Sequence, residues 1–261
     1  MDPEQPFTML DDESQACGAF NKTKRPLIIG VTGGMASGKS TVARMIAGKG
    51  ILHVDADRLV HQLLRTDHDT IAAIAAAFPQ CVVPENEATL HVSVGSILVE
   101  DQPPTKSQGR FGSPAREERE LVSPLLIHRS KLAAHIAHHP EALGTLEAIL
   151  HPRVRALEEA AIHAARRNRL RAVVLDVPLL FETDADQLCD VVVVAHATLQ
   201  HRRRRAFARA GMTEEKWQRL LARQVTEHHR HPRADVVIRT DAGKAATRQK
   251  IKRLMCAWGV V

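Results

Sequence analysis

Residues 28–41 read IIGVTGGMASGKST, and this stretch decides the fold. The apolar run Leu27–Val31 predicts a buried strand, the glycines after it predict a tight turn, and Ser40–Lys49 is compatible with a helix. Within the turn, residues 33–40 match the pattern G-x-x-x-x-G-K-[ST], the Walker A motif. Strand, glycine-rich turn and helix follow one another in the order that this motif requires, so the sequence predicts a phosphate-binding loop.

The residue types of this loop suit a nucleotide and a metal ion. Glycines let the backbone bring N–H groups close to phosphate oxygens, and the helix N-terminus adds partial positive charge. Lys39 can reach the β- and γ-phosphates, and the Ser40 hydroxyl can bind Mg²⁺. We therefore predict that ATP and Mg²⁺ bind here. The expected ATP-binding residues of the loop are Gly33, Gly34, Met35, Ala36, Ser37, Gly38, Lys39, Ser40 and Thr41.

Composition limits the other classes of function. The 261 residues are 44% hydrophobic, which allows a sizeable core, and the four cysteines form no C-x-x-C pair. No secretory signal and no apolar run long enough to cross a membrane is found, so we expect a cytoplasmic protein without membrane contact. The formal charge of +6 predicts anionic partners, either nucleic acid or a nucleotide with a phosphorylated substrate.

Five apolar segments alternate with helical ones, which predicts a three-layer α/β fold around a five-stranded parallel sheet. The strands are expected at 27–31, 51–54, 172–175, 191–195 and 236–238. Helices are expected at 58–65, 70–78, 131–139, 141–150 and 152–167, with Pro152 as a first-turn proline. Residues 1–24 are expected to form a flexible N-terminal extension, and residues at about 91–124 an inserted loop.

Three aspartates follow predicted strands. Asp55 and Asp57 come after 51–54, where a carboxylate can face a ligand crevice or can cap the helix that starts at Arg58. Asp176 ends an apolar strand in the Walker B form, whose carboxylate helps to hold Mg²⁺, although strands also end in aspartate where the chain turns. The residues alone leave both pairs of interpretations open.

The segment between the last two strands is strongly basic. Residues 201–233 include the run His201–Arg205 and then Arg209, and they predict two helices joined by a turn at 210–212. Such charge is compatible with a solvated face, a nucleic-acid patch, or a lid that stabilises charge on a transferred phosphoryl group. The basic run is not interleaved with aromatic residues that could stack on bases, which disfavours a surface for single-stranded nucleic acid.

Several motifs together resemble the dephospho-CoA kinase family. They are VTGGMASGKSTVA at 31–43, Asp-Ala-Asp at 55–57, ILHPRV at 149–154, DVPLLFE at 176–182, and the series Arg205, Arg209, Gln224, Arg230 and Ala234-Asp235. The resemblance covers about residues 26–257. It implies a P-loop NTPase fold related to nucleoside monophosphate kinases, with a core at about 25–60, 150–200 and 234–261. A helical substrate-binding subdomain at about 61–149 and a lid at about 201–233 would complete it.

The resemblance also implies roles for individual residues. ATP would donate its γ-phosphoryl group to the ribose 3'-hydroxyl of dephospho-CoA, giving coenzyme A and ADP. Lys39, Asp57 and Arg205 would be catalytic, with Asp57 as the base near the 3'-hydroxyl and Arg209 beside Arg205 at the ATP. The substrate site would comprise Thr32, Asp57, His151, Pro178 and Leu179, with Arg129 as a further match; Ser40 and Asp176 would hold Mg²⁺.

Some positions depart from the family pattern. Met35-Ala36 stands where an apolar residue and glycine are usual, Phe78-Pro79 where Phe-Gly is common, and Arg202 where glutamine is usual. Arg239-Thr240-Asp241 replaces an Asn-containing turn, which puts the contacts on the adenine side of ATP in doubt.

Two alternative functions stay open. One is a P-loop kinase for another small acceptor, such as a nucleoside monophosphate. The other is a basic nucleic-acid-binding protein that uses ATP as a switch. We favour small-molecule substrates over nucleic acid and expect a monomer or weak homo-oligomer.

Overall fold

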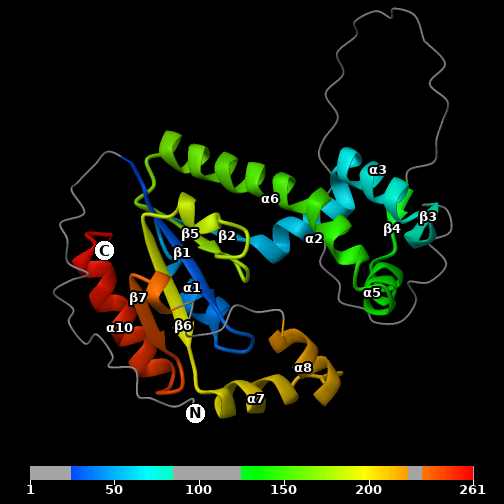
Figure 1. Cartoon of the computed structure of the whole chain (residues 1–261). Coiled ribbons are helices and arrows are strands. Elements are labelled where there is room, and N and C mark those ends of the chain that lie inside the picture. The colour runs from blue at the N-terminus through cyan, green and yellow to red at the C-terminus, as the bar shows by residue number, and fades with distance from the viewer. Residues whose placement is uncertain (1–24, 85–124, 223–230, 261) are drawn as a thin grey trace, which may run out of the picture. The chain divides into compact units, whose positions relative to one another are not determined.

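The computed structural model describes residues 25–84, 125–222 and 231–260. These residues form two compact units (Figure 1). The first takes in the chain up to His61 and from His151 onward, and the second comprises Gln62–Leu150. The expected N-terminal extension, the expected insertion at 91–124, and Gln224 and Arg230 of the lid series lie outside the described residues.

A parallel five-stranded sheet forms the centre of the first unit, as predicted. The strand order is β2-β5-β1-β6-β7, so β1, which carries the phosphate loop, lies in the middle. Parallel register places Val31 of β1 beside Asp176 of β5 and Val193 of β6. The strands are β1 (Leu27–Gly33), β2 (Ile51–Asp55), β5 (Ala172–Asp176), β6 (Val191–His196) and β7 (Val236–Arg239).

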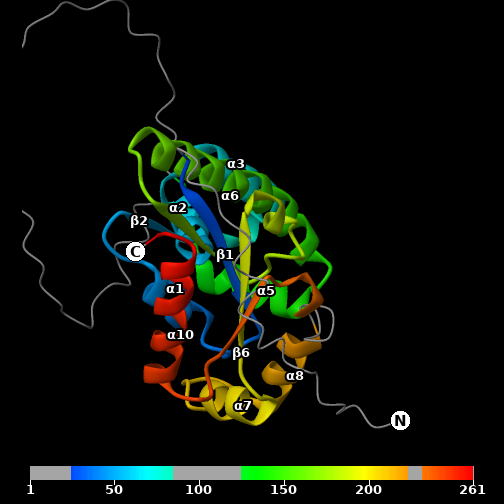
Figure 2. The same ribbon diagram turned by 90° about the vertical axis from the view of Figure 1, so that its left-hand side faces the viewer.

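Both faces of this sheet are covered, because alternate residues of each strand enter two separate apolar clusters. Ile29 and Val31 face α1 (Lys39–Ile46) and α10 (Lys244–Ala257), which lie side by side (Figures 1 and 2). Ile28 faces the other way, into a cluster with Ile162 of α6 (Ala142–Arg167). This two-sided burial explains why the strands read as continuous apolar runs.

The basic segment after β6 forms two helices, as predicted. They are α7 (Leu199–Phe207) and α8 (Glu214–Ala222), with Gly211 at φ +74° in the connection. The hydroxyl of Thr213 accepts a hydrogen bond from the Lys216 N–H at 3.3 Å, so it caps α8. The 3₁₀ turns η2 (Ala185–Leu188) and η3 (His231–Arg233) precede β6 and β7.

The second unit is mainly helical. It contains most of α2 (Ala56–Thr66), all of α3 (His68–Ala77) and α5 (Arg129–His138), and the start of α6. The turn η1 (Pro79–Cys81) leads into β3 (Val82–Pro84), which pairs with β4 (Leu125–Ile127) in an antiparallel ribbon. Asp67 caps α3 by accepting a hydrogen bond from the Thr70 N–H at 2.9 Å.

Three expectations about secondary structure were wrong. The two strands of the antiparallel ribbon, β3 and β4, were not among the expected strands, because three residues are too few to show alternation. The first helix ends at Ile46, before Lys49. The two helices expected at 141–150 and 152–167 are one helix, α6, with Pro152 inside it. A proline lacks an N–H and costs one helical hydrogen bond. Here Leu150 on one side of Pro152 and Ile162 on the other are both buried, and this burial offsets the cost.

None of the helices in the described part of the chain is long and apolar enough to span a membrane.

Candidate active site

The phosphate loop connects β1 to α1 in the middle of the sheet. Gly33 ends β1, and a Cβ there would collide with the Ala195 carbonyl oxygen of β6, so the close approach of the two strands requires glycine. Gly38 precedes α1 with φ +94°, again a conformation that favours glycine. The Gly38 carbonyl oxygen accepts hydrogen bonds from the N–H groups of Thr41 and Val42 as the helix starts. The N-terminus of α1 therefore faces the loop, as phosphate binding requires.

Ala36 adopts the left-handed conformation although it is not glycine. Its φ is +60°. The usual glycine at this position would reach that angle without steric conflict, whereas a residue with a Cβ meets a penalty of about 1 kcal/mol. The departure seen in the sequence therefore raises the energy of the loop backbone.

Two arginines of α7 hold this loop by its carbonyl groups. Arg202 is only 5% exposed, and its Nε donates to the Met35 carbonyl oxygen at 2.9 Å. Arg205 donates through Nη1 to the carbonyl oxygens of Ala36 at 3.4 Å and Ser37 at 3.3 Å. These residues, with Thr240, are called the loop clamp from here on.

Thr240 ties Arg205 and the loop to the end of β7. Arg205 donates to the Thr240 hydroxyl at 3.0 Å and to its carbonyl oxygen at 2.8 Å, and the Thr240 hydroxyl donates to the Ser37 carbonyl oxygen. The departures at Arg202 and Thr240 thus act on the same loop as the departure at Ala36. Sequence reasoning noticed all three substitutions separately, and only the structure shows that they meet.

Lys39 and Asp176 form an ion pair at the base of the loop. Asp176 is completely buried at the end of β5, where register places it beside Asp55 of β2. Its second oxygen, Oδ2, has no hydrogen-bond partner among the described residues, and His53 Nε2 lies 3.8 Å from it, beyond hydrogen-bond distance.

Asp176 and Ser40 fit a magnesium ion. Magnesium prefers oxygen ligands and is usually bound by one or two carboxylates together with substrate phosphates. A buried carboxylate oxygen without a partner at the carboxyl end of β5 is such a ligand, and the Ser40 side chain lies at the exposed start of α1. No cluster of three or more His, Cys, Asp or Glu side chains that could hold a metal by themselves occurs in the part of the chain that is described, and a phosphate-linked magnesium site does not need one.

Of the two roles expected for Asp55 and Asp57, Asp55 caps a helix and Asp57 faces a cavity. The N–H of Arg58 donates to Asp55 Oδ1 at 3.3 Å, so Asp55 caps α2. Asp57 forms no such bond in the described chain and lines a cavity. Burial raises the pKa of Asp57 above its ordinary value of 3.8, the positive charge of Lys39 opposes this, and the negative charges of Asp55 and Asp176 reinforce it. The Asp57 carboxyl group is therefore close enough to Lys39 for an electrostatic interaction between them.

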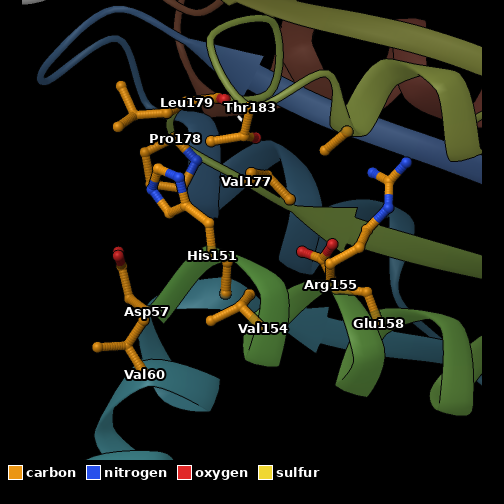
Figure 3. A pocket seen from close by; sticks show the side chains of 12 residues that line it. Asp57, Val60, His151, Val154, Arg155, Glu158, Val177, Pro178, Leu179 and Thr183 are labelled. Atoms are coloured by element: carbon orange, nitrogen blue, oxygen red, sulfur yellow. Dashed lines mark hydrogen bonds between the residues drawn. The ribbon is translucent and has the colours of Figure 1, made fainter. Parts of the chain in front are cut away.

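The cavity has a volume of about 220 Å³ and lies within the first unit (Figure 3). Its walls are mainly apolar, and α2, α6 and the segment after β5 supply them. His151 points from α6 toward Pro178, and Asp57 stands at one end (Figure 3). The other lining residues are Ala56, Val60, Val154, Arg155, Glu158, Val177, Leu179, Thr183 and Ala185.

The structure brings most of the predicted substrate residues to this cavity. Asp57, His151, Pro178 and Leu179 line it, and the Thr32 hydroxyl donates to the Pro178 carbonyl oxygen at 3.2 Å. Arg129 starts α5 in the second unit.

The two predicted lid arginines differ in their contacts. The Arg205 guanidinium is part of the loop clamp, whereas the Arg209 side chain is exposed and has no ion-pair partner in the described residues. Sequence reasoning missed the cavity walls formed by Val60, Val154 and Val177, and it also missed Glu158. Val154 and Val177 lie within the motifs ILHPRV and DVPLLFE, but an apolar residue in a motif does not by itself distinguish a cavity wall from the core, and Glu158 belongs to no motif.

Comparison with known proteins identifies relatives. The family model described as dephospho-CoA kinase matches residues 27–94 and 121–246. A dephospho-CoA kinase of Rhodopseudomonas palustris (strain BisB18) is 33% identical over 230 residues, which is 88% of this chain and 94% of that protein. A dephospho-CoA kinase of Rhodospirillum rubrum is 35% identical over 217 residues, covering 83% of this chain and 84% of that protein. A crystal structure of TT1252 from Thermus thermophilus is similar with a TM-score of 0.63 and 25% identity, covering 89% of this chain and 97% of that one.

Proposed function

The chain belongs to the dephospho-CoA kinase family, and we propose that it transfers the γ-phosphoryl group of ATP to the ribose 3'-hydroxyl of dephospho-CoA, giving coenzyme A and ADP. The observation that carries this proposal is the placement of Asp57. It lies at the mouth of an apolar cavity, within electrostatic reach of Lys39 in the phosphate loop. A hydroxyl group held at Asp57 would be close to the end of an ATP bound in that loop.

Asp57 would orient the acceptor hydroxyl and take its proton as the bond to phosphorus forms. A carboxylate can do this only in its ionised form; burial raises the pKa of Asp57, and the positive charge of Lys39 opposes that rise and favours the ionised form. Thr32, His151, Pro178 and Leu179 would position the acceptor, whose ribose must lie with its hydroxyl in line with the leaving oxygen of ADP.

Lys39 would neutralise charge on the γ-phosphoryl oxygens as they move toward the acceptor. The transition state is loose and its charge lies on the equatorial oxygens, so positioned cations lower the barrier without bonding changes of their own. Ser40 and Asp176 would hold Mg²⁺, which when bound would neutralise part of the charge of the ATP phosphates. Lys39 would then exchange its contact with Asp176 for contacts to phosphate.

Arg205 and Arg209 are proposed to serve the lid in different ways. The donors of Arg205 are directed at Ala36, Ser37 and Thr240, which supports a role in fixing the loop around the phosphates. The exposed guanidinium of Arg209 is available for the transferred phosphoryl group. Closure of the lid would also exclude water, which competes as an acceptor.

The test is the release of ADP by the purified full chain with ATP and Mg²⁺. Dephospho-CoA, AMP, CMP, adenosine and a sample without acceptor are compared, and products are identified by mass. We expect release only with dephospho-CoA, with coenzyme A as product. Preference for another acceptor would overturn the substrate assignment and retain the phosphoryl transfer. Binding of RNA or DNA with a steep salt dependence, without any turnover, would favour a nucleic-acid switch instead.

A further inference from the structure

The cavity contains a second carboxyl group that the proposed reaction does not use. Glu158 of α6 lines the cavity and is only 2% exposed. Asp57 stands at one end of the cavity and Glu158 toward the other (Figure 3). No described residue forms a hydrogen bond or an ion pair with Glu158. The neighbouring Arg155 instead donates to the Asp184 carbonyl oxygen and pairs with Glu159, each at 3.3 Å.

An unpartnered carboxyl group in such a place is most stable when it is protonated. Burying an ionised carboxylate among apolar side chains costs several kcal/mol, and the group avoids this by keeping its proton. Burial raises the pKa of Glu158 to about 7; Arg155 opposes the rise and Glu159 adds to it. A protonated carboxyl group offers one hydrogen-bond donor and one acceptor side by side, like the amide of glutamine.

The position of Asp57 limits which part of the acceptor can reach Glu158. If Asp57 holds the ribose 3'-hydroxyl, the groups attached to that ribose are its purine base and its pyrophosphate. The pyrophosphate is charged, whereas the cavity is mainly apolar and holds a carboxyl group, and Arg155 in its lining is already engaged by the Asp184 carbonyl oxygen and Glu159. The cavity therefore disfavours the pyrophosphate. The flat, uncharged base suits walls made of Val60, Val154 and Val177.

We propose that Glu158 is a specificity-determining residue that hydrogen-bonds the edge of the acceptor's adenine base. This inference rests on the proposed function. Adenine presents an amino group next to a ring nitrogen, one donor beside one acceptor, and amide side chains pair with it in the same two-point way. The protonated carboxyl of Glu158 accepts from the amino group and donates to the ring nitrogen.

Two substitutions separate this role from simple packing. Glu158→Gln keeps one donor and one acceptor, and Glu158→Leu removes both while filling the space. We expect Glu158→Leu to raise the KM for dephospho-CoA about tenfold, the value of a good hydrogen bond, and to leave the KM for ATP unchanged. Glu158→Gln should stay near the wild type. Glu159→Gln is the matched control, since Glu159 is the next residue of α6 and is half exposed.

An altered acceptor gives the sharper test. Dephospho-CoA whose adenine is replaced by unsubstituted purine lacks the amino group. We expect kcat/KM of the wild type to fall about tenfold with this analogue. In Glu158→Leu the same change of acceptor should have little effect, because the partner of the amino group is already gone.

The pH dependence of the KM provides a readout that does not require a folded leucine variant. The charged and titratable groups near Glu158 are Arg155, Glu159 and His151 on α6, Asp57 on α2, Asp186 within η2, and Cys189 and Asp190 just after η2. Cys189 stays neutral because burial raises its pKa to about 12. Wild-type KM for dephospho-CoA should therefore rise as the pH passes about 7 and Glu158 loses its proton. The KM of Glu158→Gln should stay level over this range.

Each failure has its own meaning. If the wild type does not phosphorylate dephospho-CoA at all, the proposed function falls. If it does phosphorylate dephospho-CoA, but the purine analogue lowers kcat/KM by the same factor in the wild type and in Glu158→Leu, Glu158 does not contact the amino group of the base. The proposed contact is then overturned, and the proposed reaction stands. The same holds if Glu158→Leu raises the KM without any coupling to the amino group, because Glu158 would then contact another part of the acceptor.

Discussion

In the proposed reaction the phosphate loop and the cavity lined by Asp57 and Glu158 are the donor half and the acceptor half of one site, and the chain builds them in opposite ways. The loop is one continuous segment whose carbonyl groups accept hydrogen bonds from Arg202, Arg205 and Thr240. The cavity is assembled from three distant segments, and its two carboxyl groups, Asp57 and Glu158, have no hydrogen-bond partners in the described chain. The protein therefore fixes the backbone of the phosphate loop with its own contacts and leaves the carboxyl groups of the cavity available to a ligand.

The strongest test of the donor half is Lys39→Ala. Removing the cation that would neutralise the γ-phosphoryl group should lower kcat by about a thousandfold. Single-turnover kinetics with dephospho-CoA measures the effect, and thermal melting shows whether the fold survives the loss of the Asp176 partner. Lys49→Ala, just beyond α1, serves as the control and should leave the rate unchanged. A variant at Lys39 with wild-type turnover would contradict the role.

On the acceptor half, Asp57→Asn should lower kcat by about a hundredfold or more, since general-base catalysis contributes at least that much. The KM for ATP should stay unchanged. The neighbouring Asp55→Asn is the matched control: it weakens the cap of α2 at a cost of at most about 1 kcal/mol and should retain turnover. An equal loss of rate in Asp57→Asn and Asp55→Asn would contradict a specific role of Asp57. It would show that the reaction depends on the total negative charge at the end of β2.

The pH profile checks the same residue independently. The base must be ionised, so kcat/KM falls as the pH drops through the pKa of Asp57. Burial raises that pKa above 3.8, and the acid limb should therefore lie at higher pH than for an ordinary aspartate. If the limb persists in residual activity of Asp57→Asn, another group is responsible for it.

The two halves also differ in how far the sequence reveals them. The loop was readable because its motif is contiguous and its chemistry dictates residue types at fixed spacing, and the apolar strands around it were equally local. Glu158 lies on a helix where a carboxylate ordinarily predicts a solvated face, and only the packing of the segment after β5 buries it. Arg202 stood out as an unusual residue, but its reach to Met35, far away in the chain, could not be predicted from sequence.

A smaller effect distinguishes the loop clamp from the cavity. Arg202→Ala removes the hydrogen bond that Arg202 Nε donates to the Met35 carbonyl oxygen and loosens the loop, so the KM for ATP should rise about tenfold while the KM for dephospho-CoA stays constant. The control is Arg204→Ala, an exposed arginine of the same helix. If the KM for dephospho-CoA rises and the KM for ATP does not, the result contradicts this role and indicates that α7 acts on the acceptor.

The smallest expected effect concerns the strain that the clamp tolerates. Ala36 is held at φ +60°, and glycine reaches this angle without the Cβ penalty but gains more freedom in the unfolded chain. Ala36→Gly should therefore raise the stability by at most about 1 kcal/mol, measured as the midpoint of urea unfolding. Ala47→Gly, at φ −59° after α1, has no strain to relieve and should lower the midpoint instead. If Ala36→Gly also lowers it, the gain in unfolded-chain entropy outweighs the strain.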